Sequence, residues 1–407
     1  MPILDIDFVR SQFPAFSETD INATAFFESA GGSYPCRQVV DRLERFYRER
    51  KVQPYWAFDQ SRVAGEEMDE ARTRLSAILG VDEDELCFGP STTQNSYVLA
   101  QAFRQWLSPG DAIIVTNQDH EANTGFWRRL AAEGIEVREW LIDPETGHLD
   151  PRDLPGLLDG ARLLCFPHCS NVIGEINDVT SITGIARQAG VFTCVDGVSY
   201  APHGFPNVTD LGADIYLFSA YKTYGPHQGV MVVRRELAEK LPNQGHGFNA
   251  GYLNKKFVPA GDDHAQIAAC AGMADYVDAL YASMGLDHRN ASERAGAVHD
   301  AMRQTEIELL QPLLDFVVSK NSLRLIGPTD AEKRAPTVSI LSSRPGEEIA
   351  GELAHHGIAT GGGDFYSPRP LQAMGIDTDH GILRLSFTHY TSRRELDRLI
   401  SALDHVL

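Results

Sequence analysis

The sequence predicts an α/β fold, with a large domain built on a mostly parallel central sheet and a small α+β domain on its C-terminal side. Up to about residue 262, short apolar runs alternate with amphipathic helical stretches, which is the pattern of parallel strands joined by helices. Beyond that point long helical patterns dominate and few strand–helix crossovers remain. We therefore expect an N-terminal segment (1–25) that packs on the small domain, a large domain (26–262) and a small domain (263–407).

The helices of the large domain are predicted from apolar residues at helical spacing. Two amphipathic helices are expected at residues 36–50 and 65–80, and Gly80 ends the second because glycine readily closes a helix. A third helix begins at Ser91 and runs to the turn SPGD. Strands are expected at AIIV (112–115), ARLLCF (161–166), VFTCV (191–195) and DIYLF (214–218).

The C-terminal part combines long helices with a few strands. Helical patterns fill residues 264–316. Strands are expected near SLRLIG, TVSIL and ILRLSF, and helices at GEEIAGELAHHG and SRRELDRLISALDHVL. This order, without repeated crossovers, favours a small α+β domain.

Charge and cysteine content narrow the function. The formal net charge is -20, so the surface repels nucleic acid and anionic membranes and a small-molecule substrate is expected. No apolar run approaches the roughly 20 residues of a membrane-spanning helix. The six cysteines form no CxxC pair and no secretory segment opens the chain, which predicts a reduced, cytoplasmic protein. We expect no metal, because the histidines and cysteines lack ligand spacing.

Polar side chains follow the four strands predicted in the large domain. In open α/β sheets ligands bind at the carboxyl ends of the strands. A single polar residue there usually only begins a solvated loop, but four clusters of different chemical type together predict a site. The clusters contain His120, Asn171, Asp196 with Ser199, and Ser219 with Lys222.

Two of these residues suggest which site it is. Lys222 can form an imine with an aldehyde cofactor, and Asp196 can keep a pyridine nitrogen protonated so that the ring accepts electrons. Each also has an ordinary explanation, Asp196 as a helix cap and Lys222 as a strand-edge lysine that discourages aggregation. Because the two lie one strand–helix–strand unit apart, we favour a pyridoxal-phosphate (PLP) site with a Schiff base on Lys222.

A phosphate group needs a cradle of its own. The segment FGPSTTQNSY places Ser91, Thr92 and Thr93 at the start of a helix, where free N–H groups and the helix dipole attract an anion. Simple N-capping explains the same residues equally well. The segment carries neither the GK[ST] of a nucleotide-binding P-loop nor GxGxxG, which disfavours a nucleotide-binding oxidoreductase.

These motifs resemble those of the class V aminotransferases of PLP fold type I, in particular the cysteine desulfurase-like branch. The resemblance runs from about Phe26 to Leu403 and includes FFESAGGSYP, STTQN, DHEAN, HCSNVIGEIND, VDGVSYAPH, FSAYKTYGPHQG and LRLSFTHYTSRRELDRL. It implies the fold type I architecture and the cofactor pyridoxal 5'-phosphate. It also implies a homodimer with the site at the subunit interface.

The resemblance implies roles for the residues of these motifs. Thr92 and Thr93 would bind the phosphate, with Ser219 and Tyr221 near it, and His120 would stack on the cofactor ring. Asp196 would face the ring nitrogen, and Lys222 would be the imine lysine. Ser199 stands where many relatives have a glutamine that touches the ring hydroxyl. Asn171 would face both substrate and cofactor, and Arg384 would bind the substrate α-carboxylate.

The chain also departs from the desulfurase pattern. The loop GIATGGGDFYSPRP contains no cysteine, and Tyr366 stands where desulfurases carry a nucleophilic thiol. The last cysteine, Cys270, lies in an alanine-rich helical stretch typical of core packing. In addition, PAGDDH lacks the family's threonine that reaches the phosphate of the neighbouring subunit, and Asp262 would repel that group.

The expected chemistry begins with an amino acid that displaces Lys222 from the cofactor, after which Lys222 takes the Cα proton. We expect a cysteine desulfurase-like or C–S lyase-type β-elimination without a catalytic cysteine. An aminotransferase or an epimerase of the class V family is the alternative. A catalytically silent PLP-binding regulatory protein is the alternative from another class.

Overall fold

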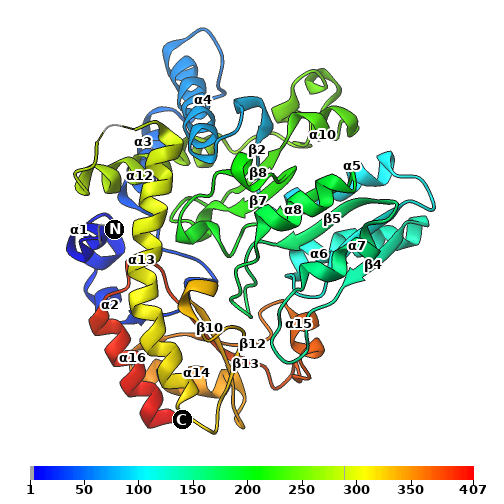
Figure 1. The fold of residues 1–407 in the computed structure, drawn as a ribbon. Coiled ribbons are helices and arrows are strands. Elements are labelled where there is room, and N and C mark those ends of the chain that lie inside the picture. The colour runs from blue at the N-terminus through cyan, green and yellow to red at the C-terminus, as the bar shows by residue number, and fades with distance from the viewer. Residues whose placement is uncertain (1–3, 288) are drawn as a thin grey trace.

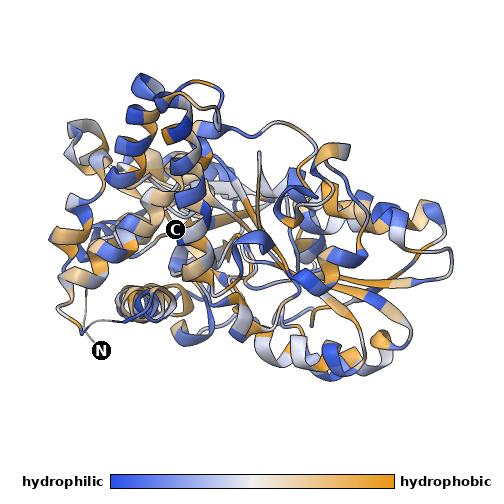
Figure 2. Cartoon of the chain, turned by 90° about the horizontal axis from the view of Figure 1, so that it is seen from above, coloured by the Kyte–Doolittle hydropathy of each residue, from blue (hydrophilic) through white to orange (hydrophobic). Residues whose placement is uncertain are grey.

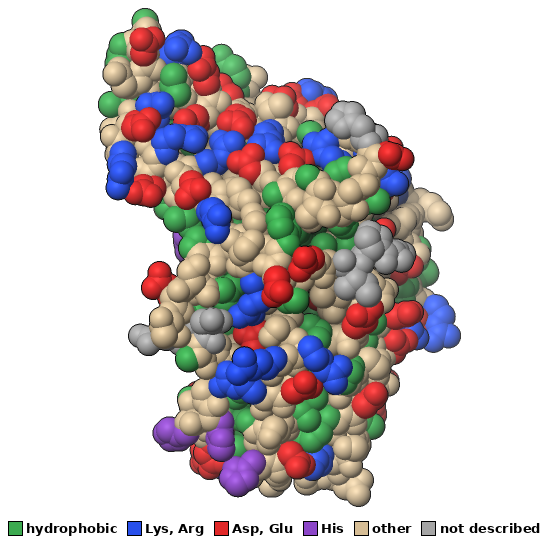
Figure 3. Space-filling view, turned by 90° about the vertical axis from the view of Figure 1, so that its left-hand side faces the viewer, with side chains coloured by type: hydrophobic (Ala, Val, Ile, Leu, Met, Phe, Trp, Pro, Cys, Tyr) green, Lys and Arg blue, Asp and Glu red, His purple; other side chains and the backbone are tan. Residues whose placement is uncertain are grey.

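The computed structural model describes residues 4–287 and 289–407. Its centre is a seven-stranded sheet with helices on both faces, and the 28-residue helix α13 (Ala291–Val318) runs from this part to a small second sheet (Figure 1). No helix in the described ranges is long and apolar enough to cross a membrane. Acidic and basic side chains are interspersed over the face shown in Figure 3.

The large sheet confirms the predicted α/β architecture. Its strands, in spatial order, are β2 (Leu86–Gly89), β8 (Gly229–Val233), β7 (Ile215–Ser219), β6 (Phe192–Asp196), β5 (Ala161–Pro167), β3 (Ala112–Thr116) and β4 (Glu136–Trp140). Only β8 runs antiparallel to its neighbours. The sequence-based prediction found β3, β5, β6 and β7 and missed the other three strands.

Helices cover both faces of this sheet, so its strands are apolar on both sides. The helices α5 (Thr92–Trp106), α6 (Glu121–Arg128) and α10 (Arg235–Lys240) share one core with one face, and α7 (Leu154–Leu158) and α8 (Val179–Gln188) share another core with the opposite face. Neighbouring strand residues alternate between the two cores: Ile113 belongs to the first and Ile114 to the second. Figure 2 shows the apolar strands enclosed by helices that are polar on their outer sides.

The helices before the sheet agree with the prediction except at one end. The helix α3 (Arg37–Glu49) lies where residues 36–50 were expected. The helix α4 (Asp59–Leu79) begins six residues before the expected start, because polar residues with no apolar spacing form its first turns. As predicted, Gly80 ends α4 in the left-handed conformation, with a φ of 68°.

The small sheet is antiparallel, in the order β12 (Gly361–Gly363), β13 (Ile382–Ser386), β10 (Thr337–Leu341) and β9 (Arg324–Ile326). Two helices, α14 (Gly346–His355) and α16 (Arg393–Val406), pack with it and with α13. The strand β1 (Ala25–Phe26) pairs with β11 (Ile358–Ala359) and ties the N-terminal segment to this part. The helices α11 (His264–Ala269) and α12 (Ala271–Ser283) pack against α3 and α4. The domain boundaries at residues 25 and 262 stay a prediction.

Candidate active site

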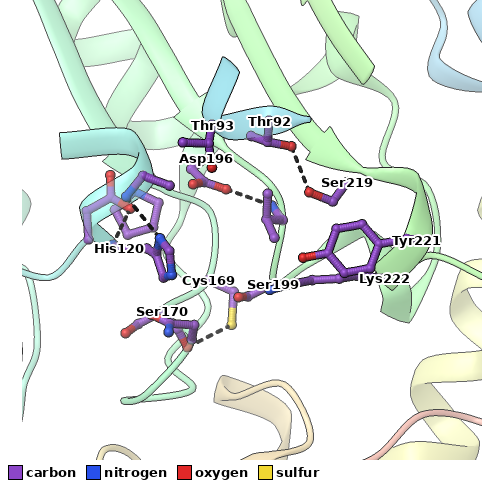
Figure 4. Close-up of a pocket in the computed structure, with 15 residues that line it drawn as sticks. Thr92, Thr93, His120, Cys169, Ser170, Asp196, Ser199, Ser219, Tyr221 and Lys222 are labelled. Carbon is purple, nitrogen blue, oxygen red and sulfur yellow. Dashed lines mark hydrogen bonds between the residues drawn. The ribbon is translucent and has the colours of Figure 1, made fainter. Parts of the chain in front are cut away.

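Two adjoining cavities lie at the carboxyl ends of β3, β5, β6 and β7. The outer cavity has a volume of about 520 Å³, and its wall includes Arg384. Most of the residues expected at the site line the inner cavity, and Figure 4 shows many of these side chains around one space. They are Thr92, Thr93, His120, Asn171, Asp196, Ser199, Ser219, Tyr221 and Lys222.

Lys222 ends a short 3-10 turn that follows β7 directly, so the strand delivers its amine to the cavity. Burial and, to a lesser extent, the charge of Arg384 lower the pKa of Lys222 to about 8, although Asp196 and Glu28 act in the opposite direction. Near neutral pH an appreciable part of this lysine is therefore the neutral amine. The neutral amine is the form that attacks an aldehyde or accepts a proton.

Asp196 is the last residue of β6 and is buried. Its Oδ1 accepts a hydrogen bond from the N–H of Val198 at 2.8 Å. Burial raises the pKa of Asp196 to about 6, although the Val198 N–H and Lys222 both favour the carboxylate. Among the described residues none hydrogen-bonds to Oδ2 of Asp196. One carboxylate oxygen is thus available to a protonated ring nitrogen.

A second carboxyl group, Asp119, lies beside Asp196 and was missed in the sequence. Its Oδ1 accepts a hydrogen bond from the N–H of His120 and its Oδ2 from Nδ2 of Asn123. Burial and the charge of Asp196 raise the pKa of Asp119 well above its ordinary value. The sequence did contain a signal for Asp119, because this residue directly precedes His120 in the polar segment that follows β3.

His120 caps α6, and its Nδ1 accepts a hydrogen bond from the N–H of Ala122 at 3.0 Å. Burial, together with the charges of Lys222 and Arg384, lowers the pKa of His120 to about 4. The imidazole is therefore neutral at physiological pH, with its proton on Nε2. A neutral ring of this kind suits stacking against another aromatic ring.

The start of α5 offers an anion-binding site. Ser91 caps this helix by accepting a hydrogen bond from the N–H of Gln94. The hydroxyl groups of Thr92 and Ser219 are hydrogen-bonded at 2.8 Å, which joins the helix start to the end of β7. Thr93 lines both cavities. The first N–H groups of a helix have no partner within it, so this end of the cavity fits a phosphate.

Arg384, on β13, is 3% exposed and reaches the outer cavity. Its Nη2 donates to Oε1 of Glu28 at 2.5 Å and its Nη1 to the carbonyl of Asn171 at 3.2 Å. The Phe365 ring covers the guanidinium at 3.8 Å. The segment FFESAGGSYP, which contains Glu28, was expected near the substrate, but the contacts of Glu28 and Phe365 with Arg384 were not, since Glu28 is 356 residues away from Arg384 in the sequence.

The amide of Asn171 holds a loop. Its Nδ2 donates to the carbonyl of Phe365 at 3.1 Å, and its Oδ1 accepts a hydrogen bond from the hydroxyl of Ser367 at 2.8 Å. The carbonyl of Tyr366 accepts a hydrogen bond from the N–H of Glu121. Phe365 and Tyr366 have φ values of 53° and 57°, a conformation that costs free energy in residues with a Cβ. The loop therefore keeps Phe365 on Arg384 against local backbone strain.

The loop that carries Tyr366 contains no cysteine. Tyr366 is 76% exposed at the mouth of the outer cavity, and its ring centre lies 5.9 Å from that of His120. All six cysteines are free and buried. Only Cys169 lines either of these cavities, and burial raises the pKa of its thiol to about 12. A thiol with that pKa is a poor nucleophile.

The side chains of the cavities fit pyridoxal phosphate. A lysine amine, a buried carboxylate with a free oxygen, a neutral imidazole and a helix N-terminus surround one space. These groups match an aldehyde, a ring nitrogen, a ring face and a phosphate. Asp262 lines a separate cavity that includes neither Lys222 nor Asp196, and its relation to the phosphate of a neighbouring subunit stays a prediction.

Comparisons with known proteins find similarity over nearly the whole chain. Residues 25–399 match the family described as Aminotransferase class-V. The chain is 34% identical to the aminotransferase-like protein FGM3 of Gibberella zeae, with 99% of this chain and 98% of that protein covered. It is 29% identical to a cysteine desulfurase of Serratia proteamaculans, with 98% of each covered.

Solved structures of cysteine desulfurases have the same fold. The apo enzyme of Thermococcus onnurineus NA1 superposes with a TM-score of 0.85 at 22% identity, covering 100% of this chain and 98% of that one. The Escherichia coli enzyme CsdA superposes with a TM-score of 0.83 at 24% identity, covering 100% and 99%. These two structures confirm the predicted fold type I architecture.

Proposed function

The chain belongs to the Aminotransferase class-V family, and we propose that it is an enzyme that holds pyridoxal 5'-phosphate on Lys222 and acts on an amino acid. The observation that carries this proposal is that Lys222, Asp196 and the helix start at Thr92 line one cavity. We further propose a desulfurase-like or C–S lyase-type β-elimination. Its support is the similarity to proteins named cysteine desulfurase over nearly the whole chain.

When bound, the cofactor supplies an aldehyde that captures amines and a ring that withdraws electrons from the substrate Cα. Lys222 would hold the aldehyde, and Asp196 would hold a proton at the ring nitrogen. Thr92 and Thr93 would bind the phosphate together with the N-terminus of α5. The neutral imidazole of His120 would lie against the ring, and Ser199 would hydrogen-bond its hydroxyl group.

Lys222 would also be the base that removes the Cα proton of a bound substrate. A pKa of about 8 suits this task, because the amine is partly neutral near physiological pH yet basic enough to accept a proton. Arg384 would hold the α-carboxylate and fix the direction of the Cα–H bond. Phe365, which covers the guanidinium, keeps water from that face of Arg384.

We propose that no cysteine takes part in the reaction. Support comes from the burial of all six thiols and from the raised pKa of Cys169, which is about 12. Sulfur would then leave directly as sulfide, without a persulfide on the protein. The main alternative is an aminotransferase, which the relative named aminotransferase-like protein favours. An epimerase and a catalytically silent PLP-binding protein are further alternatives.

Product analysis tests this reaction type. Incubation with a panel of L-amino acids, including cysteine, should release sulfide, pyruvate and ammonia, and this release should persist in Cys169→Ala, because that thiol stays protonated. Cys270→Ala, a core substitution outside both cavities, is the matched control. With a keto-acid acceptor added, conversion of an amino acid to its own keto acid without release of sulfide or ammonia would identify an aminotransferase. No product from any amino acid, with or without the acceptor, would identify a silent protein. A persulfide on a cysteine, with activity abolished by its substitution, would contradict the thiol-free reaction.

We expect Arg384→Lys to weaken the use of amino acids selectively. A guanidinium binds a carboxylate through two parallel hydrogen bonds, a geometry that an ammonium does not reproduce. Loss of one charge-assisted hydrogen bond predicts a fall in kcat/KM on the order of ten- to a hundredfold. The control substrate is the amine that lacks the carboxylate, whose slow reaction should hardly change. An equal loss for both compounds would show that Arg384 is structural.

We propose further that the protein is a homodimer in a reducing, cytoplasmic compartment. Support for a partner comes from large exposed aromatic side chains on two segments, 55–58 and 248–252, since such side chains are frequent at interfaces. They are Tyr55, Trp56, Phe58, Phe248 and Tyr252. The six unpaired cysteines are typical of a reducing compartment.

A further inference from the structure

The substrate-binding arginine already has an anionic partner inside the chain. We propose that Glu28 is a specificity-determining residue: it occupies the carboxylate subsite at Arg384 and weakens the selection of substrates with a free carboxylate. This inference rests on the proposed role of Arg384 in binding amino acids. The ion pair joins Glu28 Oε1 and Arg384 Nη2 at 2.5 Å, inside the outer cavity.

The backbone of Glu28 is held in place by the strand that carries Arg384. Glu28 forms an isolated bridge with Ser386, two residues beyond Arg384 on β13. The N–H of Ser29 donates to the carbonyl of Ser386, and the N–H of Ala30 donates to its hydroxyl group at 2.9 Å. Only the side chain of Glu28 is thus free to leave Arg384.

Two glycines make room for the Glu28 carboxylate. A Cβ on Gly31 would lie 2.7 Å from Oε1, and a Cβ on Gly361 would lie 3.2 Å from Oε2. Gly361 is also the strand partner of Arg384 across β12 and β13. A Cβ on Gly31 would press on the carboxylate in its observed position, so Gly31 leaves room for Glu28 beside Arg384.

The pair is nevertheless incompletely matched. Within the described ranges, Oε2 of Glu28 and Nε of Arg384 are both buried without a hydrogen-bond partner. An unpaired buried polar group costs free energy. A carboxylate that binds two guanidinium nitrogens in parallel would leave less unsatisfied. The Glu28 side chain is 27% exposed in a cavity of about 520 Å³, so space exists for it to move away.

A carboxylate that competes for Arg384 changes what the site selects. With Glu28 in place, the charge of Arg384 is balanced, so an anionic group gains little there over a neutral one. A substrate carboxylate has to displace Glu28 and loses part of its binding free energy in doing so. Amides and esters of amino acids do not meet this cost. The site should therefore discriminate less between a free and a blocked carboxyl group than it would if Arg384 had no partner in the chain.

The test uses cofactor-free protein, and calorimetry with propionate and propionamide as probes. Wild-type protein should bind the two compounds with similar affinity. Glu28→Gln removes the competing charge and should tighten propionate binding by about ten- to a hundredfold, the value of one charge-assisted hydrogen bond, without changing propionamide binding. Glu28→Ala, which empties the subsite, should do the same. Propionate should also raise the Tm of both variants more than that of the wild type.

The matched control is Glu70→Gln, which makes the same chemical change in a glutamate paired with Arg42 at 2.8 Å, outside both cavities. Its propionate affinity should equal that of the wild type. The inference is overturned if propionate binds the two Glu28 variants no more tightly than it binds the wild type, or if Glu70→Gln tightens it equally. Because the probes need no cofactor, this result is independent of whether Lys222 holds PLP.

Discussion

Lys222→Ala is expected to lower kcat by on the order of a thousandfold or more, since a positioned general base alone contributes roughly 10²- to 10⁴-fold. The variant loses both the amine that would hold the cofactor and the base that would take the Cα proton. Borohydride reduction of the reconstituted wild-type protein, followed by peptide mass spectrometry, should locate the cofactor on Lys222. Lys240→Ala is the control, because Lys240 forms an exposed ion pair with Glu236 on α10.

The pH dependence of cofactor capture gives a second readout of the same lysine. Burial lowers the pKa of Lys222 to about 8, so the reactive neutral amine increases as the pH rises. The rate of PLP capture by cofactor-free protein should therefore rise with pH up to about 8 and level off above it. Labelling of another lysine, or near-normal turnover in Lys222→Ala, would contradict the central proposal.

The residues that line the inner cavity could be brought together from the sequence because the fold places them by a local rule. His120, Asn171 and Ser199 each follow the carboxyl end of a buried strand, and Asp196 ends one. Because parallel strands end at the same edge of a sheet, residues distant in the chain meet there without any knowledge of their contacts. The apolar runs that define these strands are readable from the sequence alone.

The contacts around Arg384 in the outer cavity could not be predicted by this rule. Glu28 meets Arg384 only because β1 pairs with β11 and the next residues pair with Ser386, which are contacts between the two ends of the chain. The left-handed conformation of Phe365 and Tyr366 is equally invisible in the sequence, since neither residue favours it. It depends on the amide of Asn171, which lines both cavities and also holds this loop.

Asp196→Asn should keep the fold and some bound cofactor but lower kcat on the order of a thousandfold or more, as expected when a positioned electrostatic partner of the reacting group is lost. A carboxylate stabilises a proton on the ring nitrogen, whereas an amide does not, and an unprotonated ring withdraws electrons poorly. The substitution is nearly isosteric, and an amide oxygen can still accept the hydrogen bond from Val198 that Asp196 accepts at 2.8 Å. A fall in rate would therefore result from the lost negative charge and not from a lost hydrogen bond to Val198.

Asp214→Asn separates the two explanations further. Asp214 precedes β7 at the opposite edge of the same sheet, where its Oδ2 accepts hydrogen bonds from the N–H and hydroxyl of Thr193. Burial raises its pKa as it does that of Asp196, so the two substitutions remove comparable carboxylates. Turnover per folded molecule should be normal in Asp214→Asn and lost in Asp196→Asn, with similar circular dichroism spectra for both. Near-normal turnover in Asp196→Asn would mean that Asp196 only caps the chain at Val198 and that the proton on the ring nitrogen has another partner.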